Sequence, residues 1–249
     1  MSIISIDNKS TCITDSDVKL MVQASNILLP KVAEAWSMIC PKVVFASENK
    51  APADWIFHVV DTDSNVPDAL AYHTEENDHV DGYILAKTIL DSDGVILYKD
   101  QTTSTVAGAL FHELVEALMD DTVNGYWYNT NNNLLYSAEI ADPCQANNVI
   151  VTVHHAGQSV QVALSDFILP AWKDPQATTG PFNYTNTLKA PFTIDVGGYV
   201  VVLDPTCNKT NQIFGKETPV KVQEQKKKSH RISKRRRLHE HAKTKKLGS

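Results

Sequence analysis

The sequence has 249 residues, of which 43% are hydrophobic and 21% charged, a composition typical of a globular protein with a buried core. Four cysteines are too few for a disulfide scaffold, so we expect free thiols in a reducing compartment. No apolar run approaches the roughly 18 residues of a membrane span, and the first residues lack the basic and apolar regions of a signal peptide. We therefore expect an intracellular, non-secreted protein with no membrane partner.

The net charge of −6 is unevenly distributed along the chain. Residues 226–249 contain eleven Lys and Arg residues and one acid, Glu240, so the remaining chain is strongly acidic. We expect residues 1–215 to form a globular body and residues 216–249 a disordered basic tail, because this tail has too few apolar residues to offset the entropy of ordering.

The tail could bind nucleic acid or another acidic partner, or act as a nuclear import signal. A solubilising tail is the simpler alternative. The residues expected to contact phosphates are Lys226, Lys227, Lys228, Arg231, Lys234, Arg235, Arg236 and Arg237.

The elements expected before the middle of the chain are one helix and several short strands. After a polar lead, Asp15 or Ser16 can cap a helix that runs to near Pro41 and that Pro30 should kink or divide. His73 is the histidine of this region with the strongest expectation of a functional role, since it ends a strand just before an acidic loop. Short β-rich runs predict strands at 43–45, 55–60, 69–73, 83–89 and 95–98.

The second half of the chain is predicted to be rich in β-structure. A polar turn is expected at 131–133, and the runs 149–155 and 159–164 predict a hairpin that turns at Ala156 and Gly157. A last strand is expected at 199–203.

Between these halves, residues 105–121 predict a helix that Thr103, Ser104 or Thr105 could cap. Apolar side chains cover about two thirds of its circumference, which is typical of a helix inside a domain. They are Val106, Ala107, Leu110, Phe111, Leu114, Val115, Ala117, Leu118 and Met119.

A polar stripe occupies the remaining third of this helix. At 100° per residue, His112, Glu116 and Asp120 lie in one row, with Glu113 beside them. No Lys or Arg occurs between Gln101 and Gly125 to neutralise these acids. Buried carboxylates are costly unless they are paired, protonated or metal-bound, so the stripe favours a divalent cation in a cleft. An acidic helix edge open to water is the alternative.

A second acidic cluster follows at Glu139 and Asp142, directly before Pro143. Either carboxylate could point inward as a further ligand, or Asp142 could cap the turn ahead of Pro143.

The helix carries the sequence HELVE at residues 112–116 and resembles the active-site helix of the zincin metallopeptidases, whose motif is HExxH. Glu116 stands where the second histidine belongs. The preceding order of an N-terminal helix, strands and a strand bearing AYH also resembles zincins. The resemblance implies an α+β, zincin-like fold: a mixed β-sheet packed with the N-terminal helix on a buried motif helix, followed by a β-rich C-terminal part and the disordered basic tail.

Residues 15–174 also resemble phage and viral proteins with HExxE, ExxDP and DFxxPxW segments in this order. This second resemblance implies a viral, virion-associated protein.

The zincin resemblance implies that His112 and Glu116 hold Zn²⁺ or another divalent cation and that Glu113 is the general base. Glu139, Asp142 or Asp120 would supply the third ligand. One imidazole and two carboxylates nearly neutralise a dication, so we expect bound water to be acidified less than in a two-histidine site. Mn²⁺, Mg²⁺ or Ca²⁺ should also compete better with Zn²⁺ there.

Two functions follow from these features. The first is a metal-dependent hydrolase, most simply a peptidase with a peptide substrate and a metal-activated water. The second is a non-catalytic structural or virion-associated (capsid or nucleoid) protein whose tail binds nucleic acid.

If the tail binds nucleic acid, deleting residues 226–249 should abolish binding to double-stranded DNA. The full chain should bind more weakly as salt rises, because each Lys or Arg contact releases counterions. Fluorescence anisotropy at several salt concentrations measures both effects. Deleting only residues 238–249 keeps both basic clusters and should keep most of the binding. Equal affinity of the full chain and the protein without residues 226–249 would exclude the tail as the binding segment.

Overall fold

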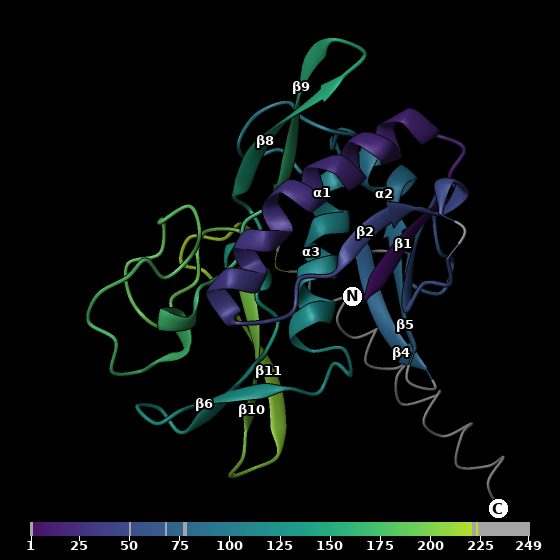
Figure 1. Cartoon of the computed structure of the whole chain (residues 1–249). Helices are drawn as coiled ribbons and strands as arrows, with labels where there is room; N and C mark the ends of the chain where they lie inside the picture. Colours follow the sequence, from purple (N-terminus) through teal and green to yellow (C-terminus); the bar gives the residue numbers. More distant parts are fainter. Residues whose placement is uncertain (1, 50, 68, 77–78, 221–222, 224–249) are drawn as a thin grey trace, which may run out of the picture.

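The computed structural model describes residues 2–49, 51–67, 69–76, 79–220 and 223, and these residues form a mixed α+β fold with three sheets (Figure 1). The basic residues 226–237 lie outside the described part of the chain. Thr218, which the sequence assigned to the tail, is buried against the body and accepts a hydrogen bond from the Gly197 amide at 3.0 Å.

The largest sheet has five strands in the order β2-β1-β3-β5-β4. Neighbouring strands run parallel except for the edge strand β4, which is antiparallel to β5. The strands are β1 (Ile3–Asn8), β2 (Lys42–Phe45), β3 (Trp55–Val60), β4 (Ala71–Glu76) and β5 (His79–Leu85).

The polar lead, for which the sequence predicted no strand, contains β1, which lies between β2 and β3 with Ile4 and Ile6 buried. Its pairing with strands far along the chain, which local sequence cannot reveal, makes this short segment a central strand.

The first helix, α1 (Asp15–Trp36), is confirmed, but it ends before the predicted stop near Pro41 and its N-cap is Thr14, not Asp15 or Ser16. Thr14 and Asp17 form a capping box at its start, and Ser37 ends it in the left-handed conformation. Pro30 does not divide the helix. Because Asn26 and Pro30 are both exposed, water can satisfy the Asn26 carbonyl that Pro30 leaves without a donor.

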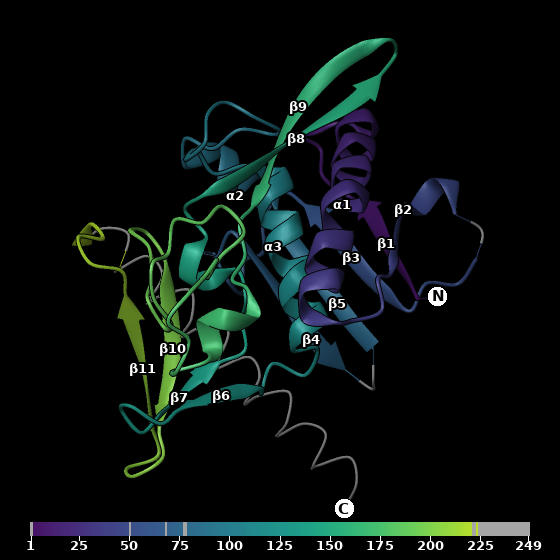
Figure 2. The same cartoon turned by 60° about the vertical axis from the view of Figure 1, so that its left-hand side comes forward.

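The motif helix, α3 (Val106–Met119), begins at Thr105, whose hydroxyl accepts a hydrogen bond from the Gly108 amide at 2.7 Å. The helix lies between the five-stranded sheet and the hairpin of β8 (Asn148–His155) and β9 (Gln158–Ser165), and α1 lies beside it (Figure 2). Side chains are therefore buried around almost its whole circumference. This confirms the prediction of a helix inside the domain.

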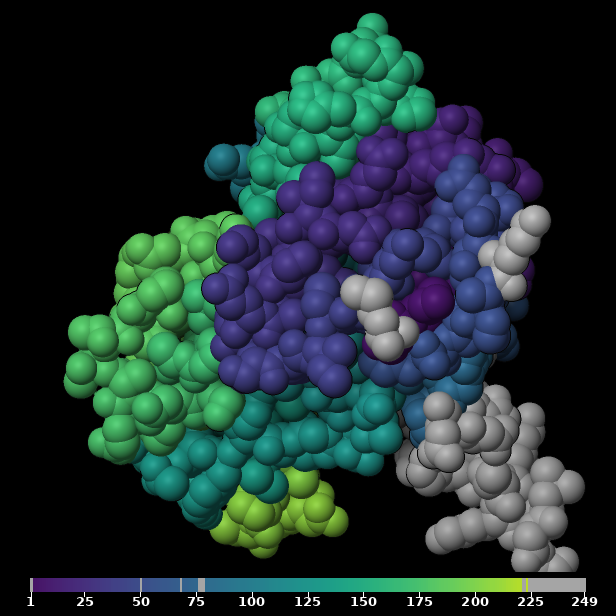
Figure 3. Space-filling model, in the orientation of Figure 1, coloured from purple at the N-terminus to yellow at the C-terminus, as the bar shows by residue number. Residues whose placement is uncertain are grey.

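The predicted hairpin and its turn are confirmed. Ala156 and Gly157 have φ values of 50° and 80°, as a two-residue turn between twisted strands requires. The tip of this hairpin projects from the body, while α1 forms much of the visible surface on the same face (Figure 3).

A second sheet of four antiparallel strands, in the order β11-β10-β7-β6, contains elements that the sequence mostly did not predict. Only β10 and the turn after β6 were predicted. The strands are β6 (Tyr126–Asn129), β7 (Leu134–Ser137), β10 (Tyr199–Asp204) and β11 (Lys209–Phe214).

Four short helical segments complete the described chain: α2 (Ala86–Asp91) and the 3₁₀ turns η1 (Ala46–Glu48), η2 (Asp142–Cys144) and η3 (Pro170–Lys173). The strand predicted at 83–89 was wrong beyond Leu85, where α2 begins. The strand predicted at 95–98 is reduced to one β-bridge between Val95 and Thr105. Within the described ranges, no helix has the length and apolar character needed to cross a membrane.

The start of β10 packs directly on η2. A Cβ atom at Gly198 would lie 2.3 Å from the Pro143 carbonyl oxygen, so only glycine allows this approach. The Asp195 amide also donates a hydrogen bond to the same oxygen at 2.9 Å. These contacts hold Asp142 and Tyr199, which begin the two elements, on one side of the fold.

The DFxxPxW segment has a structural role in holding the long loop after β9. The buried Asp166 carboxylate accepts hydrogen bonds from the Phe167 amide, the Asn183 side chain and the Thr185 hydroxyl at 2.6–2.8 Å. Trp172, which is fully buried, donates to the Thr193 carbonyl at 2.7 Å. Burial raises the pKa of Asp166 to about 6, although the hydrogen bonds from Thr185 and Phe167 lower it.

Because the pKa of Asp166 is higher in the folded protein than its ordinary value of 3.8, the folded state binds this proton more tightly than the unfolded chain. The stability that Asp166 contributes is full below about pH 4 and is lost as the pH rises past about 6. Between these limits we expect a loss on the order of 2 kcal/mol. Asp166→Asn should remove this part of the pH dependence, as measured by urea unfolding at several pH values.

Asp174→Asn, which neutralises an exposed carboxylate in the same segment, is the control and should follow the wild type. Parallel stability curves for Asp166→Asn and wild type would contradict the assignment.

Candidate metal centre

Three side chains from two elements converge at the C-terminal half of α3. Nε2 of His112 lies 3.1 Å from Oε1 of Glu116 on the next turn and 3.4 Å from Oδ1 of Asp142 at the start of η2. The Asp142 amide donates a hydrogen bond to Oε1 of Glu116 at 3.2 Å. Ligand atoms of all three side chains lie within 4.8 Å of one another.

These distances fit a divalent cation. With metal–ligand bonds of about 2.0–2.1 Å and tetrahedral angles, neighbouring ligand atoms lie about 3.3 Å apart. Asp142 and Glu116 are only 2% and 4% exposed, and Oδ2 of Asp142 has no hydrogen-bond partner among the described residues. A buried carboxylate oxygen without a donor is costly, and a cation would satisfy it.

The electrostatics of His112, Glu116 and Asp142 also favour a divalent cation. Burial raises the pKa of Glu116 to about 7, with the charge of Asp142 adding to the effect and His112 opposing it. Burial lowers the pKa of His112, but Glu116 and Asp142 outweigh it and hold this pKa well above its usual range. Among the described residues that line the adjoining cavity there is no Lys or Arg. The carboxylates thus outnumber the single imidazole that can balance them.

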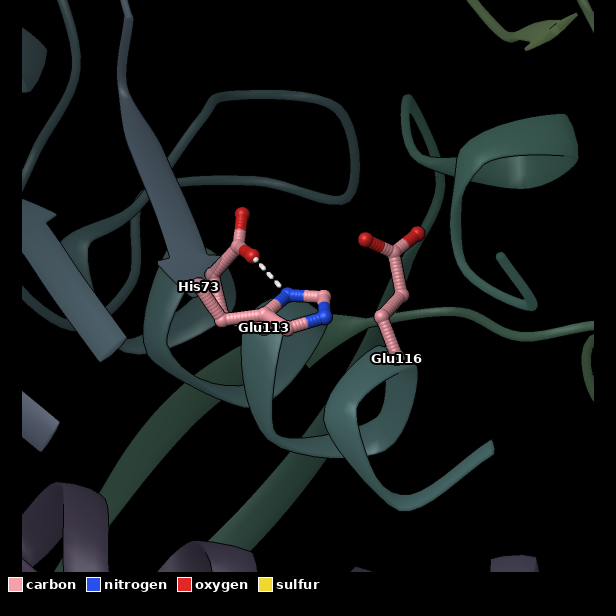
Figure 4. A group of neighbouring side chains, drawn as sticks. All are labelled: His73, Glu113 and Glu116. Atoms are coloured by element: carbon pink, nitrogen blue, oxygen red, sulfur yellow. Dashed lines mark hydrogen bonds and ion pairs between the residues drawn. The ribbon is translucent and has the colours of Figure 1, made fainter. Parts of the chain in front are cut away.

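A second pair lies on the neighbouring face of the helix. Nδ1 of His73, on the edge strand β4, is 2.9 Å from Oε2 of Glu113, and both side chains are buried (Figure 4). Nε2 of His73 is 3.3 Å from the Asp120 carbonyl oxygen. Burial lowers the pKa of His73, but the hydrogen bond and charge of Glu113 outweigh it, so the pKa is raised. With Glu116, these residues form another group that could hold a cation.

A cavity of about 310 Å³ opens beside both groups. His112, Glu113 and Asp142 line one part of it, and Ala71 of β4 and Tyr199 of β10 line other parts. Burial, followed by the negative charges of Asp142, Glu139 and Glu116, raises the pKa of Tyr199 well above its usual range. The Tyr199 hydroxyl therefore stays protonated and donates a hydrogen bond to the Asp142 carboxylate.

The structure brings together three of the four predicted metal ligands, His112, Glu116 and Asp142, and places the predicted base, Glu113, at the same cavity. Glu139 is half-buried near Tyr199 and belongs to neither cation-binding group. Asp120, the other candidate third ligand, instead caps the end of α3 by accepting from the Asn124 and Gly125 amides at 3.0 and 2.8 Å.

Sequence reasoning gave no partner to His73 and no role to Tyr199. The sequence did single out His73 by its place before an acidic loop, but its contact with Glu113 depends on how β4 packs against α3. Nothing in the local sequence distinguishes Tyr199 from an ordinary strand residue, since its position depends on the contact of Gly198 with Pro143.

Comparison with protein-family models, curated proteins and solved structures found no match.

Proposed function

We propose that this protein is a zincin-like, divalent-metal-dependent hydrolase, most simply a peptidase. The observation that carries the proposal is the convergence of His112, Glu116 and Asp142 on one point, with Glu113 beside them at the cavity. His112, Glu116 and Asp142 would hold the cation, with zinc as the first candidate. When bound, the cation would polarise a water molecule and a substrate carbonyl oxygen.

The side chains around this point have complementary roles in the proposed reaction. Glu113 lines the cavity but is not in the group with His112, so its carboxylate can accept a proton from the attacking water. The protonated Tyr199 hydroxyl lines the same cavity and hydrogen-bonds the Asp142 carboxylate, so it would orient this ligand.

The position of β4 supports a peptide as substrate. It is the last strand of the five-stranded sheet, and Leu70 and Ala71 at its start line the cavity. An extended peptide can hydrogen-bond along such an edge, which would bring its backbone carbonyl groups past the metal ligands. A mixed sheet with an antiparallel edge strand beside the motif helix also supports a zincin-like architecture.

We predict that the purified protein holds about one equivalent of divalent cation per chain after loading with Zn²⁺. A His112→Ala, Glu116→Ala double variant should hold none, because it loses two of the three ligands. Elemental analysis after dialysis measures the content. Added Zn²⁺ should raise the thermal unfolding midpoint of the wild type but not of the double variant, since a ligand that binds the folded state stabilises it.

Glu139→Gln is the matched control, because it removes a nearby carboxylate outside the group. It should keep the full metal content. A wild-type protein that binds no divalent cation, or a double variant that binds as much as wild type, would contradict the proposal.

We predict that Glu113→Gln keeps the fold and one equivalent of metal but lowers hydrolysis of dye-labelled denatured casein by about 10²–10⁴-fold. The amide is isosteric but cannot accept the proton, and general-base catalysis contributes about this factor. Initial rates of dye release from the zinc-loaded proteins measure the effect.

If wild-type protein binds the cation but cleaves no casein, that result would favour the alternative of a non-catalytic structural or virion-associated protein. Hydrolysis that survives in Glu113→Gln would exclude this residue as the base.

A further inference from the structure

His73 reaches the site from a different element than the metal ligands. It lies on β4, whereas Glu113 lies at the middle of α3 and Asp120 is the C-cap residue of this helix. The His73 side chain is 3% exposed and that of Glu113 is 8% exposed, so water screens the interaction between these two side chains very little. Figure 4 shows the imidazole between the side chains of Glu113 and Glu116.

Both partners of the His73 ring are hydrogen-bond acceptors. Nδ1 faces the Glu113 carboxylate at 2.9 Å, and Nε2 faces the Asp120 carbonyl oxygen at 3.3 Å. A ring that donates through both nitrogens makes a charge-assisted hydrogen bond to the carboxylate, which is shorter and stronger than a neutral one. His73 therefore joins two points of α3 that are about two helical turns apart.

This arrangement fixes the rotamer of Glu113. A glutamate side chain has several rotatable bonds, and ordering it costs about 1–2 kcal/mol of conformational entropy. The hydrogen bond from His73 holds Oε2 of Glu113, and Glu113 lines the cavity. A general base must lie within hydrogen-bond reach of the proton that it removes, so a fixed rotamer matters.

We propose that His73 is a positioning residue that holds Glu113 in the orientation required of the general base. This inference rests on the proposed function. Asp120 supports it from the other side, because its side chain caps the helix end and its carbonyl oxygen orients the imidazole.

A second cation between His73, Glu113 and Glu116 is the competing interpretation of the same side chains. Both ring nitrogens already face acceptors at hydrogen-bond distance, which favours a proton over a metal ion at Nδ1. The two interpretations differ in metal stoichiometry: positioning requires one cation per chain, and ligation requires two.

The test compares His73→Ala with His73→Asn in the full chain. The asparagine amide can still donate a hydrogen bond toward Glu113, whereas alanine cannot. His58→Ala is the control, because His58 is also a largely buried histidine of the same sheet but lies beside Asp7 and Asp81. Circular dichroism and metal content are measured for each protein.

Two functional readouts follow. The first is kcat and KM for casein hydrolysis by the zinc-loaded proteins. The second is the affinity of the cobalt-loaded proteins for acetohydroxamate, measured from the cobalt absorption spectrum. A hydroxamate chelates a divalent cation and can donate a hydrogen bond to a neighbouring carboxylate. Its affinity therefore reports the position of the Glu113 carboxylate without any hydrolysis.

We expect His73→Ala to keep its metal, to lose about 10- to 100-fold in kcat with little change in KM, and to bind acetohydroxamate about tenfold more weakly. His73→Asn should recover most of both losses, and His58→Ala should resemble the wild type. A second equivalent of metal in the wild type that His73→Ala loses would overturn positioning in favour of ligation.

Unchanged acetohydroxamate affinity and kcat in His73→Ala would also overturn the inference. If the wild type binds metal but cleaves no casein, the acetohydroxamate comparison still decides whether His73 positions Glu113. A wild type that binds no metal would overturn both the inference and the proposed function.

Discussion

The cost of burying carboxylates on one helix shapes this structure. Because α3 lies between a sheet and a hairpin, its acidic side chains cannot rely on water, and each needs a partner within the fold. Glu113 has His73, and Asp120 has two backbone amides. Glu116 has the His112 imidazole and the backbone amide of Asp142, so in this part of the stripe one imidazole faces the two carboxylates of Glu116 and Asp142.

The partners of the stripe come from elements on both sides of the helix. The edge strand β4 supplies His73, and the turn η2 supplies Asp142. The position of η2 depends on Gly198, where a side chain would collide with the Pro143 carbonyl, so the start of β10 and the candidate ligand Asp142 are fixed together. The cavity thus lies where the five-stranded sheet, α3 and the second sheet meet, and a small shift of any one of them would change the ligand geometry.

Features that depend on local sequence could be predicted, and features that depend on packing could not. The period of α3 and the Ala156–Gly157 turn are local, and the structure confirms them; of the three caps that the sequence allowed, the helix uses Thr105. By contrast, β1 is a central strand only because β2 and β3 pair with it. The helical spacing of the stripe likewise predicted that His112 and Glu116 are neighbours. Tertiary structure was needed to select Asp142 over Glu139 as the third candidate ligand and to identify His73 as the partner of Glu113.

The two groups on α3 differ in charge balance, and this difference separates their roles. The imidazolium of His73 and the carboxylate of Glu113 neutralise each other within the fold, so that pair is complete without a ligand. A neutral His112 with the carboxylates of Glu116 and Asp142 would carry two negative charges, which a divalent cation balances. Without a cation, the raised pKa values of His112 and Glu116 mean that bound protons balance this charge, so cation binding should displace protons. Glutamate in place of a second histidine strengthens this coupling between metal binding and stability, although it leaves the cation less able to acidify water.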